Sequence, residues 1–289
     1  NMTMIPNSAV THGGRFHADD VFSSALLRLL NPKIKIRRVM RLPENFDGLA
    51  FDIGGGDFDH HQNGAPVREN GVPYAAFGLL WRAFGDRLIP DAEEAARFDQ
   101  HFIQPLDLDD NTGCGSETAG LIALFNPGWD SGEPADRCFW EAVSFAQVIL
   151  EKRLESVRSM CRARSYVEEA LRGMVRGVVT LERFAPWKAV LSASDAQFVV
   201  YPSQRGGFSA QGVPADDETH ALKIPFPADW AGRSEEELPK LSGIATLRFC
   251  HNNRFLIAAG TRSDAVAACH AAQKVWEQSR GRGSEKNMC

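Results

Sequence analysis

Apolar positions in the first fifty residues alternate between helical and strand-like spacing. Residues 18–30 carry apolar side chains three and four positions apart, a helical pattern that the Asn-Pro step at 31–32 ends. Short apolar runs at 8–11, 33–39 and 49–53 predict strands around this helix. Because strands that alternate with helices form mostly parallel sheets, we predict an α/β fold in which ligands gather where the strands end.

Helical patterns dominate the middle of the chain. Apolar spacing predicts helices at 74–84 and 91–104. Segment 134–172 contains no glycine and, after its first residue, no proline, so as one straight helix it would extend about 58 Å. Since few helices in globular proteins are that long, we expect two helices or one bent helix in this segment.

The last third of the chain has mostly strand-like patterns. Predicted strands occupy 177–181, 188–191, 198–201 and 246–249, and the last of these can pair with 254–259 across a short turn. Ser263 is a suitable N-cap for a helix that runs to about residue 278. The polar tail at 279–289 is expected to fray.

Length and charge predict a division into two domains. A chain of 289 residues has room for about two domains. We expect an N-terminal parallel-sheet domain at 1–133, a helical linker at 134–176 and a smaller C-terminal α/β domain at 177–289. The formal net charge of −5 lies in the first 176 residues, because Lys and Arg nearly balance Asp and Glu after them. Two bound divalent cations would offset most of that negative charge.

The same composition excludes several classes of protein. A net charge of −5 does not fit a generally basic protein that coats nucleic acid. No uncharged apolar run reaches the ~18–20 residues needed to cross a bilayer, and the N-terminus has no signal-peptide pattern. The six cysteines form no Cys-x-x-Cys pair, so we expect reduced thiols in a cytoplasmic protein without a membrane partner. A homodimer stays an open alternative to a monomer.

Histidine and aspartate cluster in three short segments of the N-terminal half. These segments contain His12, His17, Asp19 and Asp20; then Asp52, Asp59, His60 and His61; then Asp107, Asp109 and Asp110. Any one of these side chains alone is typical of a turn or a helix cap, but their combination favours a metal site. Imidazole and carboxylate ligands without thiolate suit Mn²⁺ and, as a second choice, Mg²⁺. A carboxylate that bridges two such ions would let them activate a water against a phosphoryl group.

At these segments the chain resembles a known family. Phe58-Asp59-His60-His61-Gln62 resembles the motif that names the DHH phosphoesterase superfamily, and residues 12–20 resemble its first motif. Residues 71–81, Gly-Val-Pro-Tyr-Ala-Ala-Phe-Gly-Leu-Leu-Trp, are similar to the MYG exonuclease family, also catalogued as uncharacterised protein family 0160. The resemblance covers nearly the whole chain. It implies an Mn²⁺-dependent phosphoesterase, with two ions in the N-terminal domain and a C-terminal domain that closes over the substrate.

The resemblance also implies roles for individual residues. The metal ligands, by motif matching, are His12, His17, Asp19, Asp52, His60 or His61, and either Asp107 or Asp110, with Asp52 as the bridging carboxylate. Asp59, His60 and His61 form the expected catalytic group. Arg205, Gly206, Gly207 and His251 fall on the segments that hold the substrate.

The leading hypothesis from the sequence is a metal-dependent phosphodiesterase, a 3′–5′ exonuclease on short RNA or DNA. One alternative is a phosphatase of a small phosphorylated molecule such as pyrophosphate or a dinucleotide. Another alternative is an interaction protein that a metal stabilises without catalysis. A nucleic-acid enzyme differs from both because it needs a basic or aromatic track beyond the catalytic site.

Overall fold

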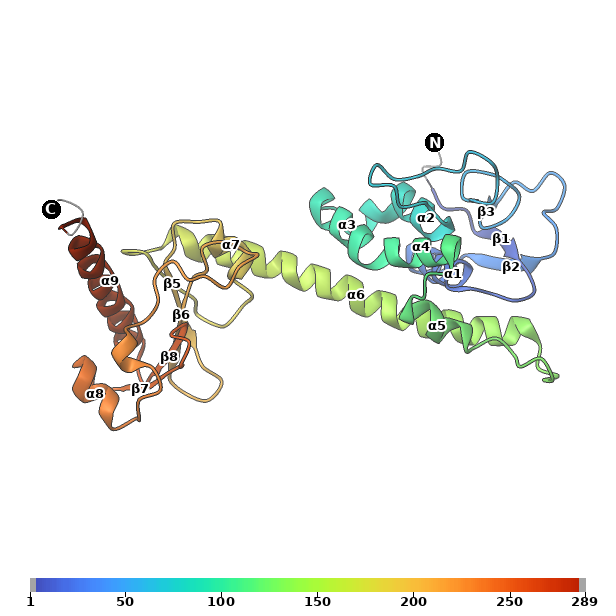
Figure 1. The fold of residues 1–289 in the computed structure, drawn as a ribbon. Helices are drawn as coiled ribbons and strands as arrows, with labels where there is room; N and C mark the ends of the chain where they lie inside the picture. Colours follow the sequence, from blue (N-terminus) through green and yellow to red (C-terminus); the bar gives the residue numbers. More distant parts are fainter. Residues whose placement is uncertain (1–3, 286–289) are drawn as a thin grey trace. The chain divides into compact units, whose positions relative to one another are not determined.

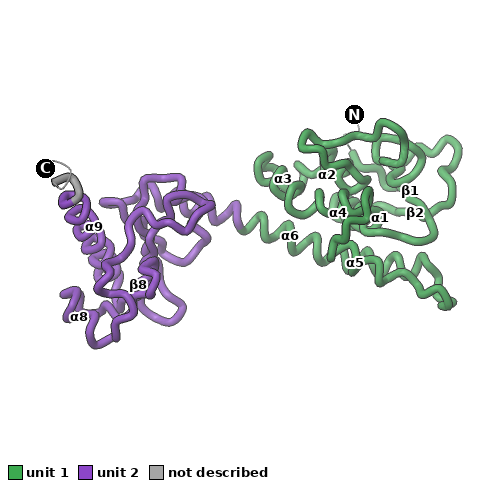
Figure 2. Tube along the Cα trace, viewed as in Figure 1, with its two compact units in different colours: residues 1–159 green, residues 160–289 purple. Residues whose placement is uncertain are grey.

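The computed structural model describes residues 4–285 of the chain. The chain forms two compact units, which we call unit 1 (residues 1–159) and unit 2 (residues 160–289), each coloured separately in Figure 2. The point of division lies inside one long helix, α6 (Ala135–Arg172).

Unit 1 contains a three-stranded parallel sheet in the order β2-β1-β3. Its strands are β1 (Ser8–His12), β2 (Lys35–Val39) and β3 (Leu49–Ala50) (Figure 1). The central strand pairs in parallel with both neighbours, so that Ala9 lies opposite Ile36 on one side and Leu49 on the other. The carboxyl ends of all three strands therefore meet at one edge of the sheet, as the sequence predicts.

Helices of unit 1 pack around this sheet and bury an aromatic core. They are α1 (Ala18–Leu30), α2 (Ala76–Phe84), α3 (Ala92–Phe98), α4 (Gln104–Thr112) and α5 (Glu117–Ala123), with a single 3₁₀ turn at Gly85–Arg87. Helix α1 has the bounds expected from its apolar spacing, and it contacts α2, α4 and α5. The rings of Phe22, Phe77 and Phe102 contact one another at the centre of the core. This packing fixes the start of α1, where the first His and Asp segment lies.

The structure refines two helical predictions in this part of the chain. The segment 91–104 is not one helix, because a π-helical turn at Asp99–Ile103 separates α3 from α4. Pro105 stands in the first turn of α4, and its missing N–H prevents the normal hydrogen-bond ladder from crossing this point. Of the two alternatives for 134–172, two helices or one bent helix, the structure excludes the first, because α6 is one continuous helix. Different parts of α6 enter different cores, which supplies the burial that a long helix needs.

Unit 2 contains a five-stranded sheet in the order β4-β5-β6-β8-β7. Its strands are β4 (Val178–Thr180), β5 (Phe198–Pro202), β6 (Phe208–Gly212), β7 (Leu247–Cys250) and β8 (Leu256–Ala259). Strands β4 and β5 are parallel, whereas all other neighbours are antiparallel, including the predicted β7–β8 hairpin. The structure thus confirms an α/β fold with a parallel sheet in the N-terminal part.

Both faces of the unit 2 sheet are covered. Along β5, Phe198 and Val200 enter one apolar cluster while Val199 and Tyr201 enter another, as the two-residue period of a strand requires. The first cluster includes side chains of α8 (Glu237–Ser242) and α9 (Arg262–Glu285), with Trp230 of the 3₁₀ turn Ala228–Trp230. The second cluster includes the C-terminal part of α6.

Two predictions for unit 2 are corrected by the structure. Residues 188–191 are not a strand but part of a short helix, α7 (Lys188–Ser192), which buries Leu191. A short apolar run has no fixed period, so its pattern could not separate the two states. The residues from Ser279 onward continue α9 as far as Glu285 instead of fraying, and 286–289 lie outside the described residues. Among the described residues, no helix is long and apolar enough to span a membrane.

Candidate metal centre

A tight loop after β3 brings the second His and Asp segment to the edge of the unit 1 sheet. Asp52 follows β3 by two residues and has a left-handed backbone, with φ of 56°. Aspartate tolerates this conformation better than most residues. The Asp52 N–H donates to the Phe58 carbonyl at 2.9 Å, which closes the loop and returns the chain to the sheet edge. His12, the last residue of β1, lies at the same edge.

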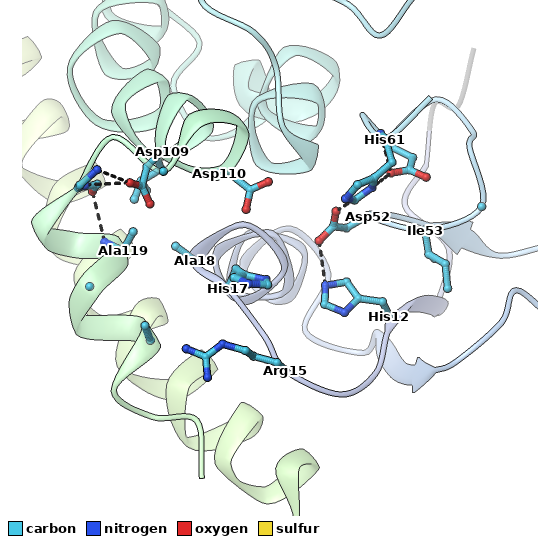
Figure 3. Close-up of a pocket in the computed structure, with 18 residues that line it drawn as sticks. His12, Arg15, His17, Ala18, Asp52, Ile53, His61, Asp109, Asp110 and Ala119 are labelled. Carbon is cyan, nitrogen blue, oxygen red and sulfur yellow. Dashed lines mark hydrogen bonds and ion pairs between the residues drawn. The ribbon is translucent and has the colours of Figure 1, made fainter. Parts of the chain in front are cut away.

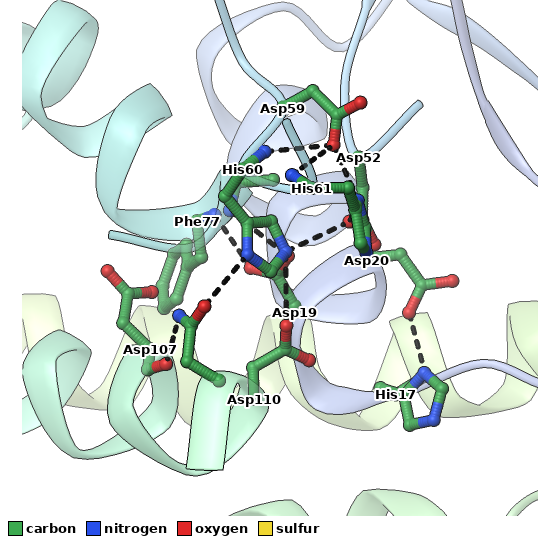
Figure 4. Close-up of polar contacts among 12 residues, drawn as sticks. His17, Asp19, Asp20, Asp52, Asp59, His60, His61, Phe77, Asp107 and Asp110 are labelled. Atoms are coloured by element: carbon green, nitrogen blue, oxygen red, sulfur yellow. Dashed lines mark hydrogen bonds and ion pairs between the residues drawn. The ribbon is translucent and has the colours of Figure 1, made fainter. Parts of the chain in front are cut away.

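Asp52 stands between two histidines. Its Oδ2 lies 3.1 Å from His12 Nε2 (Figure 3), and its Oδ1 lies 3.3 Å from His60 Nε2 (Figure 4). The Asp52 side chain is only 5% exposed. One carboxylate therefore has each oxygen directed at a different imidazole, which is the arrangement expected of a bridging ligand.

Two further carboxylates, one from α1 and one from α4, lie close to His60. His60 Nε2 lies 3.5 Å from Asp19 Oδ2 at the start of α1 and 3.1 Å from Asp110 Oδ2 in α4. Asp19 is held in place by two backbone donors at the start of α2, the Ala76 N–H at 3.0 Å and the Phe77 N–H at 2.8 Å. The segment 71–81, which suggested the family, thus positions a candidate ligand.

The His12 side adds a carboxylate that the sequence analysis did not assign. Asp20 Oδ2 lies 3.3 Å from His12 Nε2, while its Oδ1 accepts the His17 N–H at 2.8 Å and caps α1. Candidate ligand atoms of His12, His17 and Asp20 all lie within 4.8 Å of one another. In the sequence, the signal for Asp20 is its place beside Asp19 in the first motif. A capping role by itself also explains an acidic residue at that position.

Three atoms in this cluster are buried without a hydrogen bond to any described residue. They are Asp20 Oδ2, Asp52 Oδ1 and His60 Nε2. Leaving a buried polar atom unsatisfied costs about 1–3 kcal/mol. Asp20 Oδ2 lies beside His12, whereas Asp52 Oδ1 and His60 Nε2 lie beside each other, so cations placed on the two sides of the cluster would satisfy these atoms. The nitrogen and oxygen donor set fits Mn²⁺ or Mg²⁺.

Burial and charge shift the pKa values in the cluster. Burial, with the charge of Asp52, raises the pKa of Asp19 to about 7, and burial raises that of Asp20 to about 8. Although burial opposes its ionisation, contact with the His12 and His60 imidazoles lowers the pKa of Asp52 to about 2. Burial alone would lower the pKa of His12, but Asp52 and Asp20 raise it to about 9. The metal-free cluster thus holds protons that a bound cation would displace.

Asp59 organises the loop that carries the two histidines. Its Oδ2 accepts the Gly55 N–H at 2.7 Å, and its Oδ1 accepts the His60 N–H at 2.9 Å. Asp59 Oδ1 also lies 2.6 Å from His61 Nδ1. The His61 side chain is 63% exposed and lines a cavity beside the cluster (Figure 3). Asp59 therefore orients His61 and leaves its second ring nitrogen available.

Asp107 and Asp110 lie one turn apart on α4, but only Asp110 reaches the cluster. Asp107 is fully buried and accepts hydrogen bonds from Arg68 at 2.8 Å and from the Gly78 N–H at 3.2 Å. Arg68 also forms a double hydrogen bond with Asp99. A Cβ added at Gly78 would lie 1.9 Å from Asp107 Oδ2, so only glycine fits there. Asp107 thus occupies a buried ion pair.

The two proposed substrate segments of unit 2 lie apart from each other. Arg205, Gly206 and Gly207 form the turn between β5 and β6, at the end of the sheet where Phe208 pairs with Ala259. His251 follows β7 at the other end, where its N–H donates to Leu256. The four residues of β8 separate these ends by roughly 10 Å along the backbone. The two segments therefore lie at opposite ends of β8.

Unit 1 has a parallel sheet, and carboxylate and imidazole side chains cluster where its strands end. These features define the class of this protein: an α/β protein with a candidate centre for more than one metal ion. Comparison with known families places it further. The chain belongs to the uncharacterised protein family UPF0160, whose MYG1 exonuclease model matches residues 8–273.

Curated relatives from distant organisms match along most of their length. The MYG1 exonuclease of Homo sapiens is 26% identical over 324 residues, covering 93% of this chain and 86% of that protein. The MYG1 protein of Dictyostelium discoideum is 26% identical and is 93% covered. That of Chlamydia pneumoniae is 28% identical and is 99% covered. No solved structure matches the chain.

Proposed function

We propose that the protein is a metal-dependent phosphodiesterase that works as a 3′–5′ exonuclease on short RNA or DNA. The observation that carries this proposal is the position of Asp52, whose two oxygens face His12 and His60 separately. The human relative bears the name exonuclease, which supports a nucleic-acid substrate.

Two cations fit the donor set. His60, Asp19 and Asp110 would hold one, His12, His17 and Asp20 would hold the other, and Asp52 would give one oxygen to each. When bound, such a pair polarises a phosphoryl group and lowers the pKa of a water. We favour Mn²⁺ because several of the ligands are imidazoles, with Mg²⁺ as the alternative.

Residues of the chain itself would orient the substrate and supply a proton donor. We assign His61 to protonate the leaving oxygen of the scissile ester, because it lines the cavity and its Nδ1 is held by Asp59. With Nδ1–H donated to Asp59, the transferred proton is the one that Nε2 carries in the cationic form of the imidazole, and its transfer leaves His61 neutral. Arg205 and His251 are proposed to contact the substrate, and their separation means that they would contact different groups of it.

Cleavage of end-blocked oligonucleotides tests this function. With Mn²⁺ we expect a 5′-labelled tetranucleotide to shorten stepwise from its 3′ end, and a 3′-terminal block to stop the reaction. Turnover should disappear in excess EDTA and return with Mn²⁺, because the proposed water activation requires the cations. The measurement is a gel or chromatographic time course.

Pyrophosphate and a cyclic dinucleotide serve as comparison substrates. Faster hydrolysis of either than of the linear oligonucleotide would favour the small-molecule phosphatase instead. Full activity after dialysis against EDTA would contradict the metal mechanism. A protein that binds Mn²⁺ but hydrolyses none of the substrates would be the non-catalytic alternative.

Substitution of Arg205 tests the proposed substrate contact in unit 2. Loss of one charge-assisted hydrogen bond costs about 1.5–3 kcal/mol. Arg205→Ala is therefore expected to lower kcat/KM roughly 10- to 150-fold, while the Mn²⁺ content by elemental analysis stays unchanged. His251→Ala should have a milder effect of the same kind. Lys240→Ala, at an exposed position of α8, is the control. Loss of metal in the Arg205 variant would instead assign Arg205 to the structure of the site.

A further inference from the structure

A cavity of about 860 Å³ opens beside the metal cluster in unit 1 (Figure 3). His12, Asp52 and Asp110 line it on the side of the cluster, and Arg15 and α5 line it elsewhere. Its volume falls within the ~300–1,000 Å³ typical of sites for small ligands. The proposed chemistry uses only the part of this space nearest the cluster.

Arg15 is an unpaired cation at this cavity. It is exposed, lies in the loop before α1, and makes no hydrogen bond or ion pair with any described residue. Figure 3 shows its side chain reaching from that loop toward the helix that carries Ala119. Among the described residues that line the cavity, Arg15 is the only arginine or lysine. A free guanidinium in this position is suited to bind a phosphate oxygen.

The wall opposite the cluster is a face of α5 that has only small side chains. Ser116, Ala119, Gly120 and Ala123 line the cavity and recur at the three- and four-residue spacing of one helical face. A Cβ built at Gly120 meets no atom within 4 Å, so this wall borders open space. On the cluster side, Asp52 Oδ1 is buried without a hydrogen bond to a described residue, which fits the cation that the proposed function places there.

We propose that this cavity is the subsite for a single nucleotide, a nucleoside 5′-monophosphate, with Arg15 on a phosphate oxygen. The small, uncharged face of α5 would lie against its sugar and base. The inference rests on the proposed function, because hydrolysis of a terminal diester at the bond to the 3′ oxygen adds water and releases a nucleoside 5′-monophosphate. It adds a binding site for the product to that function. Arg15 sets the affinity for the phosphate, and Gly120 sets the size of the nucleotide that fits.

Titration calorimetry with two probes separates the two contacts. The full chain loaded with Mn²⁺ is titrated with AMP and, separately, with inorganic phosphate. Arg15→Met removes the charge while keeping most of the side-chain length, and is expected to weaken both ligands about 10- to 100-fold. Gly120→Leu adds a side chain whose Cβ meets no neighbouring atom, and the rest of it extends into the open space. It should weaken AMP at least about tenfold and leave phosphate affinity within about twofold.

Gly132→Leu is the matched control, because Gly132 is also exposed, has open space around it and does not line the cavity. It should change neither affinity. The inference is overturned if wild-type protein binds no AMP, if Gly120→Leu binds AMP normally, or if Arg15→Met binds both probes normally. Oligonucleotide cleavage is measured in parallel. Cleavage without AMP binding would overturn the subsite alone, whereas AMP binding without cleavage would overturn the exonuclease alone.

Discussion

Asp52→Asn is expected to lower the Mn²⁺-dependent hydrolysis of oligonucleotides about a thousandfold or more. The substitution removes the charge that both cations would share, and electrostatic stabilisation of this kind is worth several kcal/mol at about 1.4 kcal/mol per tenfold in rate. Elemental analysis should show fewer bound ions per chain. The fold should persist, because asparagine accepts the left-handed backbone of position 52 as readily as aspartate does.

Asp57→Asn is the control for this prediction. Asp57 is an exposed acidic residue in the same loop, and the structure gives it no contact with the cluster. Its substitution should change turnover by less than about twofold. Equal losses in the two variants would mean that Asp52 has no special place between the cations. Unchanged metal content in Asp52→Asn would contradict the bridging role even if activity fell.

Arg68→Met is expected to cost about 3–5 kcal/mol of the free energy of unfolding at neutral pH. Removing one partner of a buried ion pair leaves the other charge uncompensated. Here the other partner is Asp107, which is fully buried and whose pKa burial raises well above its usual value, so without Arg68 the folded state has to keep this carboxyl protonated. Chemical denaturation followed by circular dichroism measures the loss.

The loss should also depend on pH in a definite direction. Without Arg68, the pKa of Asp107 in the folded protein rises further, so the folded state holds a proton that the unfolded state has released. Stability then falls as pH rises between the unfolded and folded pKa values. The deficit of Arg68→Met relative to wild type should therefore be larger at pH 8 than at pH 5.

Arg137→Met is the control, because it makes the same substitution at an arginine whose ion pair is exposed. Arg137 faces Glu141 at 3.7 Å, with both side chains largely exposed. Such pairs contribute about 0–1 kcal/mol, and the variant should unfold almost as wild type does. If Arg68→Met instead lost metal while keeping its stability, Asp107 would belong with the metal ligands, as the sequence had allowed.

Local patterns predicted those elements whose period is long enough to be unambiguous. The helix at 18–30 is thirteen residues long, has apolar residues at helical spacing and ends clearly at Asn31. The structure buries all of its residues from Ala18 to Leu27. The run at 188–191 is too short to carry a period, so its helical state depends on the core around Leu191. The π-helical turn before α4 likewise depends on Pro105 and on packing, and a local sequence pattern does not include packing.

In the candidate site too, some features follow from the sequence pattern and others from the packing. The sequence by itself determined which residue types gather in the first 110 positions and, through the strand and helix order, that His12 and Asp52 meet at one sheet edge. It could not choose between Asp107 and Asp110, because both lie on the same helix and either face could meet the cluster. The packing of α4 against α2 made that choice by directing Asp107 to Arg68 and the Gly78 N–H.

Only the tertiary structure decided which distant segments lie near one another. The antiparallel register of β6, β8 and β7 places Arg205 and His251 near opposite ends of β8. In unit 1, α1 packs against α5, and the cavity beside them has both Arg15 and the His and Asp cluster in its lining. Periodicity and motifs report on neighbours along the chain, whereas a site depends on pairings between elements far apart in sequence, which the burial of the whole core selects.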